Sequence, residues 1–163
     1  MNVGIRWSER LASKRMGVLS LVSLATMTIA LGCGGRMPEE IGAKEGILAP
    51  CPDKPNCVSS FAEDADHQIA SIAIAGSATA TWDGLHAALT DDSSVEIVTA
   101  TDAYIHAVYT SSLMRYRDDV EFLLRADENE IAIRSASRVG YGDMGVNRSR
   151  VEAIRDALTE KGL

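Results

Sequence analysis

The segment from Arg134 to Arg150 carries the residue types best suited to chemistry in this chain of 163 residues. It contains four arginines, three glycines and one acidic residue, Asp143. Arginine binds carboxylate or phosphate through paired hydrogen bonds, and the unpaired N–H groups at a helix N-terminus also attract anions. The segment therefore predicts a non-catalytic binding site for a small anion, a lipid headgroup or an acidic glycan. The candidate ligand-binding residues are Arg134, Ser137, Arg138, Gly140, Asp143, Gly145, Asn147 and Arg148, together with Ser59 and Ser60.

The same arginines have a structural alternative. Asp118, Asp119 and Asp143 can supply partner carboxylates and fix the segment against a sheet. In that case all four guanidinium groups are shielded from solvent, and the protein is a structural or assembly partner rather than a ligand binder. A solvent-open cluster of guanidinium groups would instead favour anion binding.

A dinucleotide site is suggested by Gly140-Tyr-Gly-Asp-Met-Gly145, which matches the pattern Gly-x-Gly-x-x-Gly. That pattern works in a strand–helix–strand unit, with an acidic residue about 20 positions further on. Only 18 residues follow Gly145, and their apolar spacing is that of a helix. The histidines, His67, His86 and His106, lack the spacing of metal ligands. We therefore predict neither a cofactor nor a metal.

Ser59 and Ser60 are candidate nucleophiles, which makes a hydrolase acting on an envelope component the enzymatic alternative. A nucleophilic serine needs a base and an oxyanion hole, and His106 or Asp143 would have to be the base. The chain has no Gly-x-Ser-x-Gly motif, so no catalytic residue is assigned. This alternative predicts that the serines and the arginine segment line one cleft.

The first 32 residues have the pattern of an export signal. Residues 1–15 are polar with an excess of basic side chains, and residues 16–31 are uncharged and mostly apolar. A helix of this apolar run is roughly 24 Å long, shorter than the ~30 Å hydrocarbon core of a bilayer, although a permanent transmembrane helix is the alternative. The sequence Ala30-Leu31-Gly32-Cys33 resembles a bacterial lipobox, in which the cysteine receives the lipid.

This pattern predicts a signal peptide at residues 1–32, a lipid-bearing Cys33, a tether at residues 33–50 and one domain at residues 51–163. The protein would then be exported and anchored to a bacterial membrane, facing the periplasm or the cell surface. From Cys33 onward the net charge is −10, because the first 32 residues contribute +3 to a total of −7. A surface this acidic repels nucleic acid, so we predict no nucleic-acid partner, and the sequence specifies no protein partner.

Cys51 and Cys57 flank a loop with two prolines. An exported protein meets an oxidising compartment, where two such cysteines can form a disulfide worth about 2 kcal/mol. Unpaired thiols and a metal or redox role are the alternatives. The spacing is not Cys-x-x-Cys, and no second ligand pair has the spacing of a zinc finger.

The apolar patterns predict an α+β fold. The predicted strands span residues 67–74, 95–101, 103–112, 118–125 and 130–137. Short turns between the last four favour an antiparallel meander. Two amphipathic helices are predicted, one through residues 81–89 and one after Asn147, which we expect to cap it. The expected architecture is an antiparallel sheet of about four to five strands with both helices packed on one face.

Two unusual segments resemble a known family. They are Cys51-Pro-Asp-Lys-Pro-Asn-Cys-Val-Ser-Ser60 and Arg134-Ser-Ala-Ser-Arg-Val-Gly-Tyr-Gly-Asp-Met-Gly-Val-Asn-Arg148, supported by Asp118-Asp-Val-Glu-Phe122. Together they resemble the uncharacterised family catalogued as domain of unknown function 1499, over about residues 47–161. The family has no established activity, so the resemblance implies a domain and its motif positions but no substrate.

Overall fold

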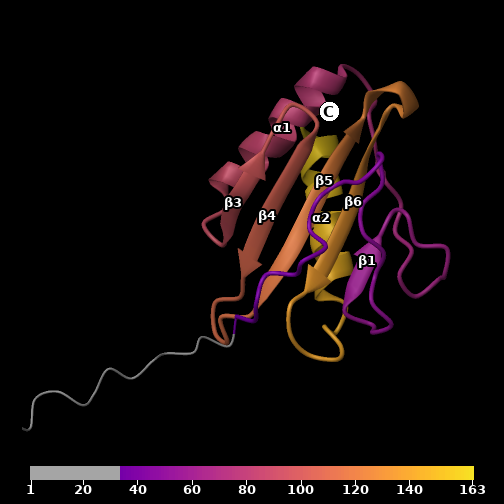
Figure 1. The fold of residues 1–163 in the computed structure, drawn as a ribbon. Coiled ribbons are helices and arrows are strands. Elements are labelled where there is room, and N and C mark those ends of the chain that lie inside the picture. Colours follow the sequence, from indigo (N-terminus) through magenta and orange to yellow (C-terminus); the bar gives the residue numbers. More distant parts are fainter. Residues whose placement is uncertain (1–33) are drawn as a thin grey trace, which may run out of the picture. The chain divides into compact units, whose positions relative to one another are not determined.

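Six strands form one antiparallel sheet in the computed structural model, which describes residues 34–163 (Figure 1). The strands are β1 (Cys57–Ser59), β2 (Ile72–Ala73), β3 (Val95–Ala100), β4 (Tyr104–Thr110), β5 (Arg117–Arg125) and β6 (Glu130–Ser137). Their order is β1-β6-β5-β4-β3, and the short β2 also pairs with β6. Helices α1 (Ala78–Asp91) and α2 (Val146–Glu160) complete the fold, with a 3-10 turn, η1 (Ala126–Glu128), between β5 and β6. The predicted α+β class with an antiparallel sheet and two helices is confirmed.

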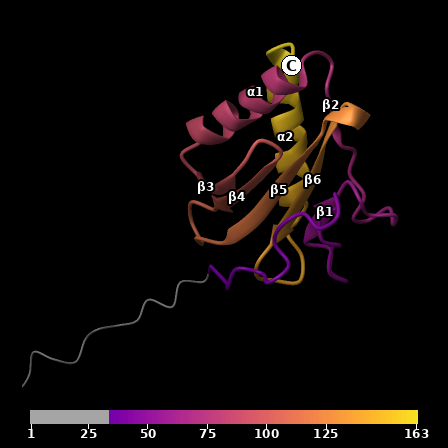
Figure 2. The ribbon, with the colours of Figure 1, turned by 45° about the horizontal axis from the view of Figure 1, so that its top comes forward.

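Both helices pack on the same face of the sheet (Figure 2). In β5 the alternation of side chains places Val120 and Phe122 on that face, where neither is exposed. Helix α1 contributes Leu85 and helix α2 contributes Val151 to the same apolar cluster. Burying one side chain of this size stabilises the fold by about 1.5–3 kcal/mol, so this face holds the main core.

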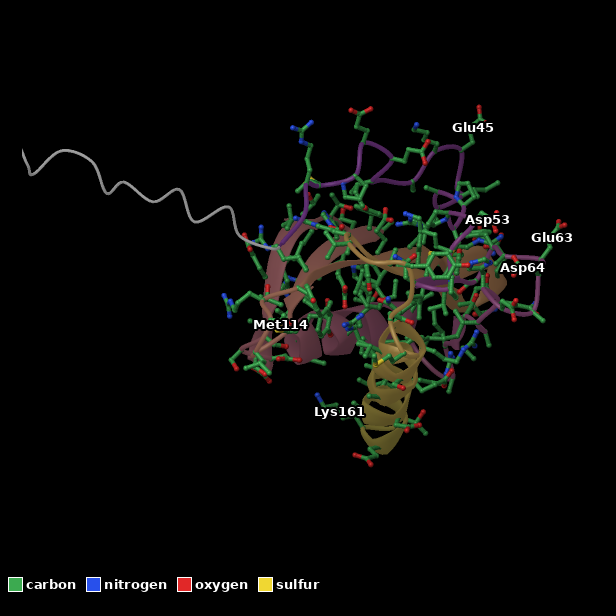
Figure 3. All side chains as sticks on the ribbon, turned by 90° about the horizontal axis from the view of Figure 1, so that it is seen from below. Glu45, Asp53, Glu63, Asp64, Met114 and Lys161 are labelled. Carbon is green, nitrogen blue, oxygen red and sulfur yellow. A yellow bond between two sulfur atoms is a disulfide. The ribbon has the colours of Figure 1, made fainter. Side chains whose placement is uncertain are left out.

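The opposite face of the sheet is covered by residues 34–50, which we call the strap. Figure 3 shows three layers, with Glu45 of the strap on one side of the sheet and Lys161, which follows α2, on the other. The strap has no helix and pairs with itself only through a bridge between Lys44 and Ile47. Its place on the sheet therefore depends on contacts with distant residues.

Two contacts tie the strap to the sheet. Leu48 is 1% exposed and packs against Leu123 of β5. The backbone N–H of Gly42 donates a hydrogen bond to Oε1 of Glu121, with an N–O distance of 2.8 Å. We expected a tether here, and the structure instead shows residues 34–50 as a layer of the folded domain.

The chain around the disulfide differs from the loop that we expected. Cys51 and Cys57 form the predicted disulfide, and Cys57 also begins β1, a strand that is not among those predicted. Only Ile72 and Ala73 of the strand predicted at residues 67–74 pair with β6. Both short strands depend on the edge of β6 rather than on their own alternation.

The predicted signal peptide at residues 1–32 and the predicted lipid-bearing Cys33 lie outside the described residues. Between residues 34 and 163, no helix is long and apolar enough to cross a bilayer. The same stretch contains no group of three or more His, Cys, Asp or Glu side chains arranged to hold a metal ion.

Candidate functional site

Ionic side chains occupy the strap-covered face of the sheet. His106 of β4 pairs with Glu121 of β5, and Glu121 pairs with Arg134 of β6. Residues that pair directly across strands point to the same face, so the three side chains form one row beneath the strap. Arg134 is 5% exposed, and His106 and Glu121 are buried even more completely. An isolated charge is unfavourable in such a place, so each charge needs a partner.

Asp119 is the centre of the first group of partners. Arg138 donates from Nε and Nη2 to the two carboxylate oxygens of Asp119, at 2.8 and 2.7 Å. His106 Nε2 lies 2.8 Å from Asp119 Oδ1. Burial raises the pKa of Asp119, but the hydrogen bonds from His106 and Arg138 outweigh burial, and the pKa is lowered. Asp119 is therefore an ionised carboxylate held by a bidentate arginine.

Glu121 is the centre of the second group and accepts three hydrogen bonds. Arg134 Nη1 donates to Oε2 at 3.1 Å, while the Tyr104 hydroxyl and the Gly42 N–H donate to Oε1, each at 2.8 Å. Burial and the negative charge of Glu121 raise the pKa of Tyr104 well above its usual value, so the hydroxyl keeps its proton. The strap, β4 and β6 thus converge on a single buried carboxylate.

A second ionic network lies on the helix-covered face, at the N-terminal end of α2. Arg150 Nη2 donates to Asp118 Oδ2 at 2.6 Å, and Arg150 Nη1 donates to Asn147 Oδ1 at 2.7 Å. The guanidinium also lies over the ring of Tyr109, 4.6 Å from the ring centroid. Burial raises the pKa of Tyr109 to about 12. Arg150 is therefore held by an acid, an amide and an aromatic ring.

Asp143 occupies the N-terminus of α2, where we expected an external anion. Its carboxylate accepts hydrogen bonds from the backbone N–H groups of Gly145 and Asn147, at 2.9 and 2.8 Å. Burial raises the pKa of Asp143, these hydrogen bonds lower it, and the net shift is downward. Gly145, with a φ of 80°, is the N-cap residue, so the prediction that Asn147 caps this helix is wrong. The chain's own carboxylate fills the position that an external anion would need.

Asn147 instead joins the two segments that we predicted to form a site. Its Nδ2 donates to the backbone carbonyl of Asn56 at 3.1 Å and to Ser137 Oγ at 2.9 Å. Asn56 Nδ2 in turn donates to the carbonyl of Gly140 at 3.2 Å. Asn147 is fully buried, so the disulfide loop and the arginine segment meet through buried amide hydrogen bonds.

Ser59 and Ser60 both bind backbone groups. Ser59 is 1% exposed, and its Oγ accepts a hydrogen bond from the N–H of Phe61 at 3.2 Å. Ser60 Oγ accepts from the N–H of Ile133 at 3.0 Å. Ser59 belongs to the same cross-strand row as His106 but lies three strand spacings away, about 14 Å. Ser59 is therefore out of hydrogen-bond reach of His106, one of the two bases that the hydrolase alternative allows.

Arg148 differs from the other three arginines of the segment. Its Nη2 donates to the backbone carbonyl of Asp66 at 3.1 Å, and the residue is partly exposed. It forms no ion pair with any residue that the structure describes, whereas Arg134, Arg138 and Arg150 each bind a carboxylate. Of the four arginines in the segment, Arg148 is therefore the one whose guanidinium holds no carboxylate among the described residues and could bind a further anion.

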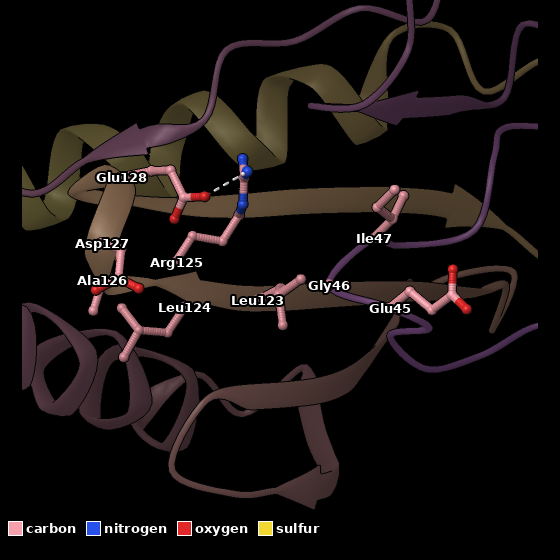
Figure 4. Close-up of a pocket in the computed structure, with 9 residues that line it drawn as sticks. All are labelled: Glu45, Gly46, Ile47, Leu123, Leu124, Arg125, Ala126, Asp127 and Glu128. Atoms are coloured by element: carbon pink, nitrogen blue, oxygen red, sulfur yellow. Dashed lines mark hydrogen bonds and ion pairs between the residues drawn. The ribbon is translucent and has the colours of Figure 1, made fainter.

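A pocket of about 490 Å³ lies at the other end of the strap (Figure 4). Glu45, Gly46 and Ile47 of the strap line one side, and residues 123–128 of β5 and η1 line the other. Its arginine, Arg125, is already bound to two carboxylates, with Nη2 2.9 Å from Glu128 Oε1 and Nη1 bonded to Glu130. None of the predicted site residues lines the pocket, and it offers an incoming anion no unpaired guanidinium.

Sequence reasoning missed Glu121 and Tyr104 as members of the site. Asp119 and Glu121 alternate with apolar residues along β5, but of these two only Asp119 was considered as a partner for the arginines. The signal that could have found them is the matching charge on the neighbouring strand, where Arg134 and Arg138 share one face. A row of acids beside a row of arginines predicts pairing in a buried layer as well as on a surface.

These features define a small α+β domain with ionic networks on both faces of its sheet. Residues 47–158 match the family model described as Protein of unknown function (DUF1499). The match covers more than half of the chain, so the protein belongs to this family, as the resemblance predicted. No curated protein and no solved structure matches the chain significantly.

Proposed function

We propose that this protein is an exported, lipid-anchored envelope protein whose domain is a non-catalytic binding module. Export and anchoring rest on the apolar run at residues 16–31 and on Ala30-Leu31-Gly32-Cys33, which resembles a lipobox. The disulfide between Cys51 and Cys57 supports an oxidising compartment. Acyl chains on Cys33 would hold the domain at the membrane, because each buried methylene contributes about 0.8 kcal/mol.

The non-catalytic part of the proposal rests on one observation, which is that the groups able to do chemistry are bound to one another. Arg134, Arg138 and Arg150 each hold a carboxylate that is at most 12% exposed. An external anion would have to displace these acids and leave them buried without a partner, which is strongly unfavourable. Ion pairs of this kind, each between a guanidinium and a carboxylate, instead hold the strands and α2 together in a rigid domain, whose outer surface is then available for binding.

The anion-binding form of the proposal now depends mainly on Arg148. Its guanidinium is partly exposed and binds only a backbone carbonyl among the described residues. A phosphate, a lipid headgroup or an acidic glycan could accept the remaining donors of this planar group. The ligand class therefore stays that of a small anion, with contact through one arginine rather than through the three that were predicted.

Metabolic labelling with an alkyne fatty acid in a bacterial host tests the anchor. We expect the wild-type chain to carry the label and the Cys33→Ala variant to carry none. The double variant Cys51→Ser/Cys57→Ser is the matched control, since it removes the other two cysteines and should keep the label. An unlabelled wild-type chain, or a labelled Cys33→Ala variant, would contradict anchoring at this residue.

A further inference from the structure

Exposed apolar side chains gather at one end of the molecule. Between residues 34 and 163, nine large apolar residues are exposed, and six of them belong to two neighbouring loops. We call these six the apolar end: Leu113, Met114 and Tyr116 between β4 and β5, and Tyr141, Met144 and Val146 between β6 and the first turn of α2. Met144 is fully exposed and Leu113 is 87% exposed, so neither side chain packs on the domain. Single apolar residues are ordinary on a surface, but a cluster of this kind indicates a contact site.

The two loops leave the sheet at the same end. Asp118, near the start of β5, pairs with Ser137, at the end of β6. The N–H of Arg138 donates to the carbonyl of Arg117 at 3.1 Å, which holds the bases of the two loops together. Both loops lie at the lower end of the domain in Figure 1, and Figure 3, which looks from below, places Met114 at its edge.

The described chain begins at this same end. A Cβ atom added to Gly34 would lie 2.8 Å from Cδ of Arg117, and a Cβ atom added to Gly35 would lie 2.8 Å from Cβ of Arg138. The start of the strap therefore lies against the bases of both loops. Cys33 immediately precedes Gly34 in the sequence. One residue spans at most about 3.6 Å. The proposed lipid anchor thus joins the domain beside the apolar end.

We propose that the apolar end docks on the lipid surface that holds the acyl chains of Cys33, with its side chains entering the interface. This inference rests on the proposed lipid anchor. Because almost no chain separates Cys33 from the folded domain, the anchor keeps the two loops next to the bilayer at a high effective concentration. A few apolar side chains are then sufficient for docking. Tyrosine suits the lipid–water interface, because its ring is apolar and its hydroxyl is polar.

Insertion of apolar side chains, rather than attraction between charges, drives this docking. The chain from Cys33 onward has a net charge of −10, which an anionic surface would repel. Exposed Arg36 and Arg115 reduce that repulsion near the loops. Docking is therefore expected on zwitterionic lipid. Docking of the apolar end would point the opposite end of the sheet, with η1 and the pocket beside it, away from the membrane.

A nitroxide on one introduced cysteine reads the depth of each end directly. Met144→Cys places the label in the apolar end, and Ile47→Cys is the matched control on an exposed apolar position at the far end of the strap. The native cysteines do not interfere, since Cys51 and Cys57 form a disulfide and Cys33 carries the lipid in this proposal. The full chain, matured in a bacterial host, is reconstituted into phosphatidylcholine vesicles. Paramagnetic resonance then measures label collisions with oxygen, which enters lipid, and with a nickel chelate, which stays in water.

We expect the label at position 144 to show several-fold more oxygen collisions and fewer nickel collisions than the label at position 47. Adding Leu113→Ser and Tyr141→Ser to the Met144→Cys variant should weaken the contact and return the label to water. Equal collision profiles at the two positions, in a sample whose Cys33 carries lipid by mass spectrometry, would overturn the docking and leave the proposed function intact. An unmodified Cys33 in that sample would overturn the proposed function and, with it, the inference.

Discussion

Asp119 and Asp143 are two carboxylates on which the internal networks depend, and each neutralises a positive group that we had considered for a ligand. Asp119 lies fully buried between Arg138 and His106. Asp143 accepts the backbone N–H groups of Gly145 and Asn147 at the start of α2. At the scale of single residues, the positive charge of Arg138 and of the α2 N-terminus is balanced inside the domain.

Acid should destabilise the domain through these two carboxylates. Each has a pKa in the folded protein below the ordinary value of 3.8, so the unfolded chain takes up protons more readily than the folded one. Their contribution to stability is therefore fully present above about pH 4 and is lost as the pH falls through the folded-state pKa. We expect the urea concentration at the unfolding midpoint to decrease as the pH is lowered below about 4. In Asp143→Asn, which keeps an oxygen acceptor but cannot titrate, this decrease should be less steep. If the urea midpoint of Asp143→Asn depends on pH as that of the wild type does, Asp143 does not contribute to the loss of stability in acid.

At the scale of elements, regular patterns were predictable from the sequence and long-range contacts were not. Strands β3 to β6 and both helices follow from alternation or from helical spacing, since each element carries its own period. The strap and β1 carry no such period. They are placed by the edge of β6 and by partners such as Glu121 and Leu123, far away in the sequence.

The candidate site shows the same division. The sequence indicated that arginines of the segment could pair with Asp118, Asp119 and Asp143, because guanidinium groups and carboxylates attract each other. It did not indicate that Asp118 and Asp119 bind arginines on opposite faces of the sheet, with Arg150 on one side and Arg138 on the other. The face on which each aspartate lies follows from the pleat and register of β5, because consecutive residues of a strand point to opposite faces of the sheet.

The strap should contribute to stability as a layer of the domain. Leu48→Ala should lower the free energy of unfolding by about 2–4 kcal/mol, because a side chain that is 1% exposed leaves a cavity against Leu123. The neighbouring Ile47, which is 53% exposed, is the matched control, and Ile47→Ala should have little effect. Urea unfolding of the two variants measures the difference. Equal, small changes would mean that the strap behaves as the tether we first expected.

At the scale of the whole molecule, the domain has two ends with different characters. The end beside Gly34 carries the apolar loops, and both ionic networks extend to it from the two faces of the sheet. The far end carries η1, the pocket and the C-terminus (Figure 1). Ionic pairs that join β4, β5, β6 and α2 stiffen the end on which the proposed membrane contact depends.

The central claim is that the arginines of the segment hold the domain together, and unfolding of Arg138→Ala beside Arg148→Ala tests it most directly. Both changes remove one guanidinium from the same segment, but only Arg138 holds a buried carboxylate in the structure. We expect Arg138→Ala to lower the free energy of unfolding by about 3–5 kcal/mol, since it leaves Asp119 buried without its main partner. We expect Arg148→Ala to lower it by about 1 kcal/mol or less. If both variants instead unfold within about 1 kcal/mol of the wild type, Arg138 is not structural, and the predicted ligand-binding role for Arg138 returns.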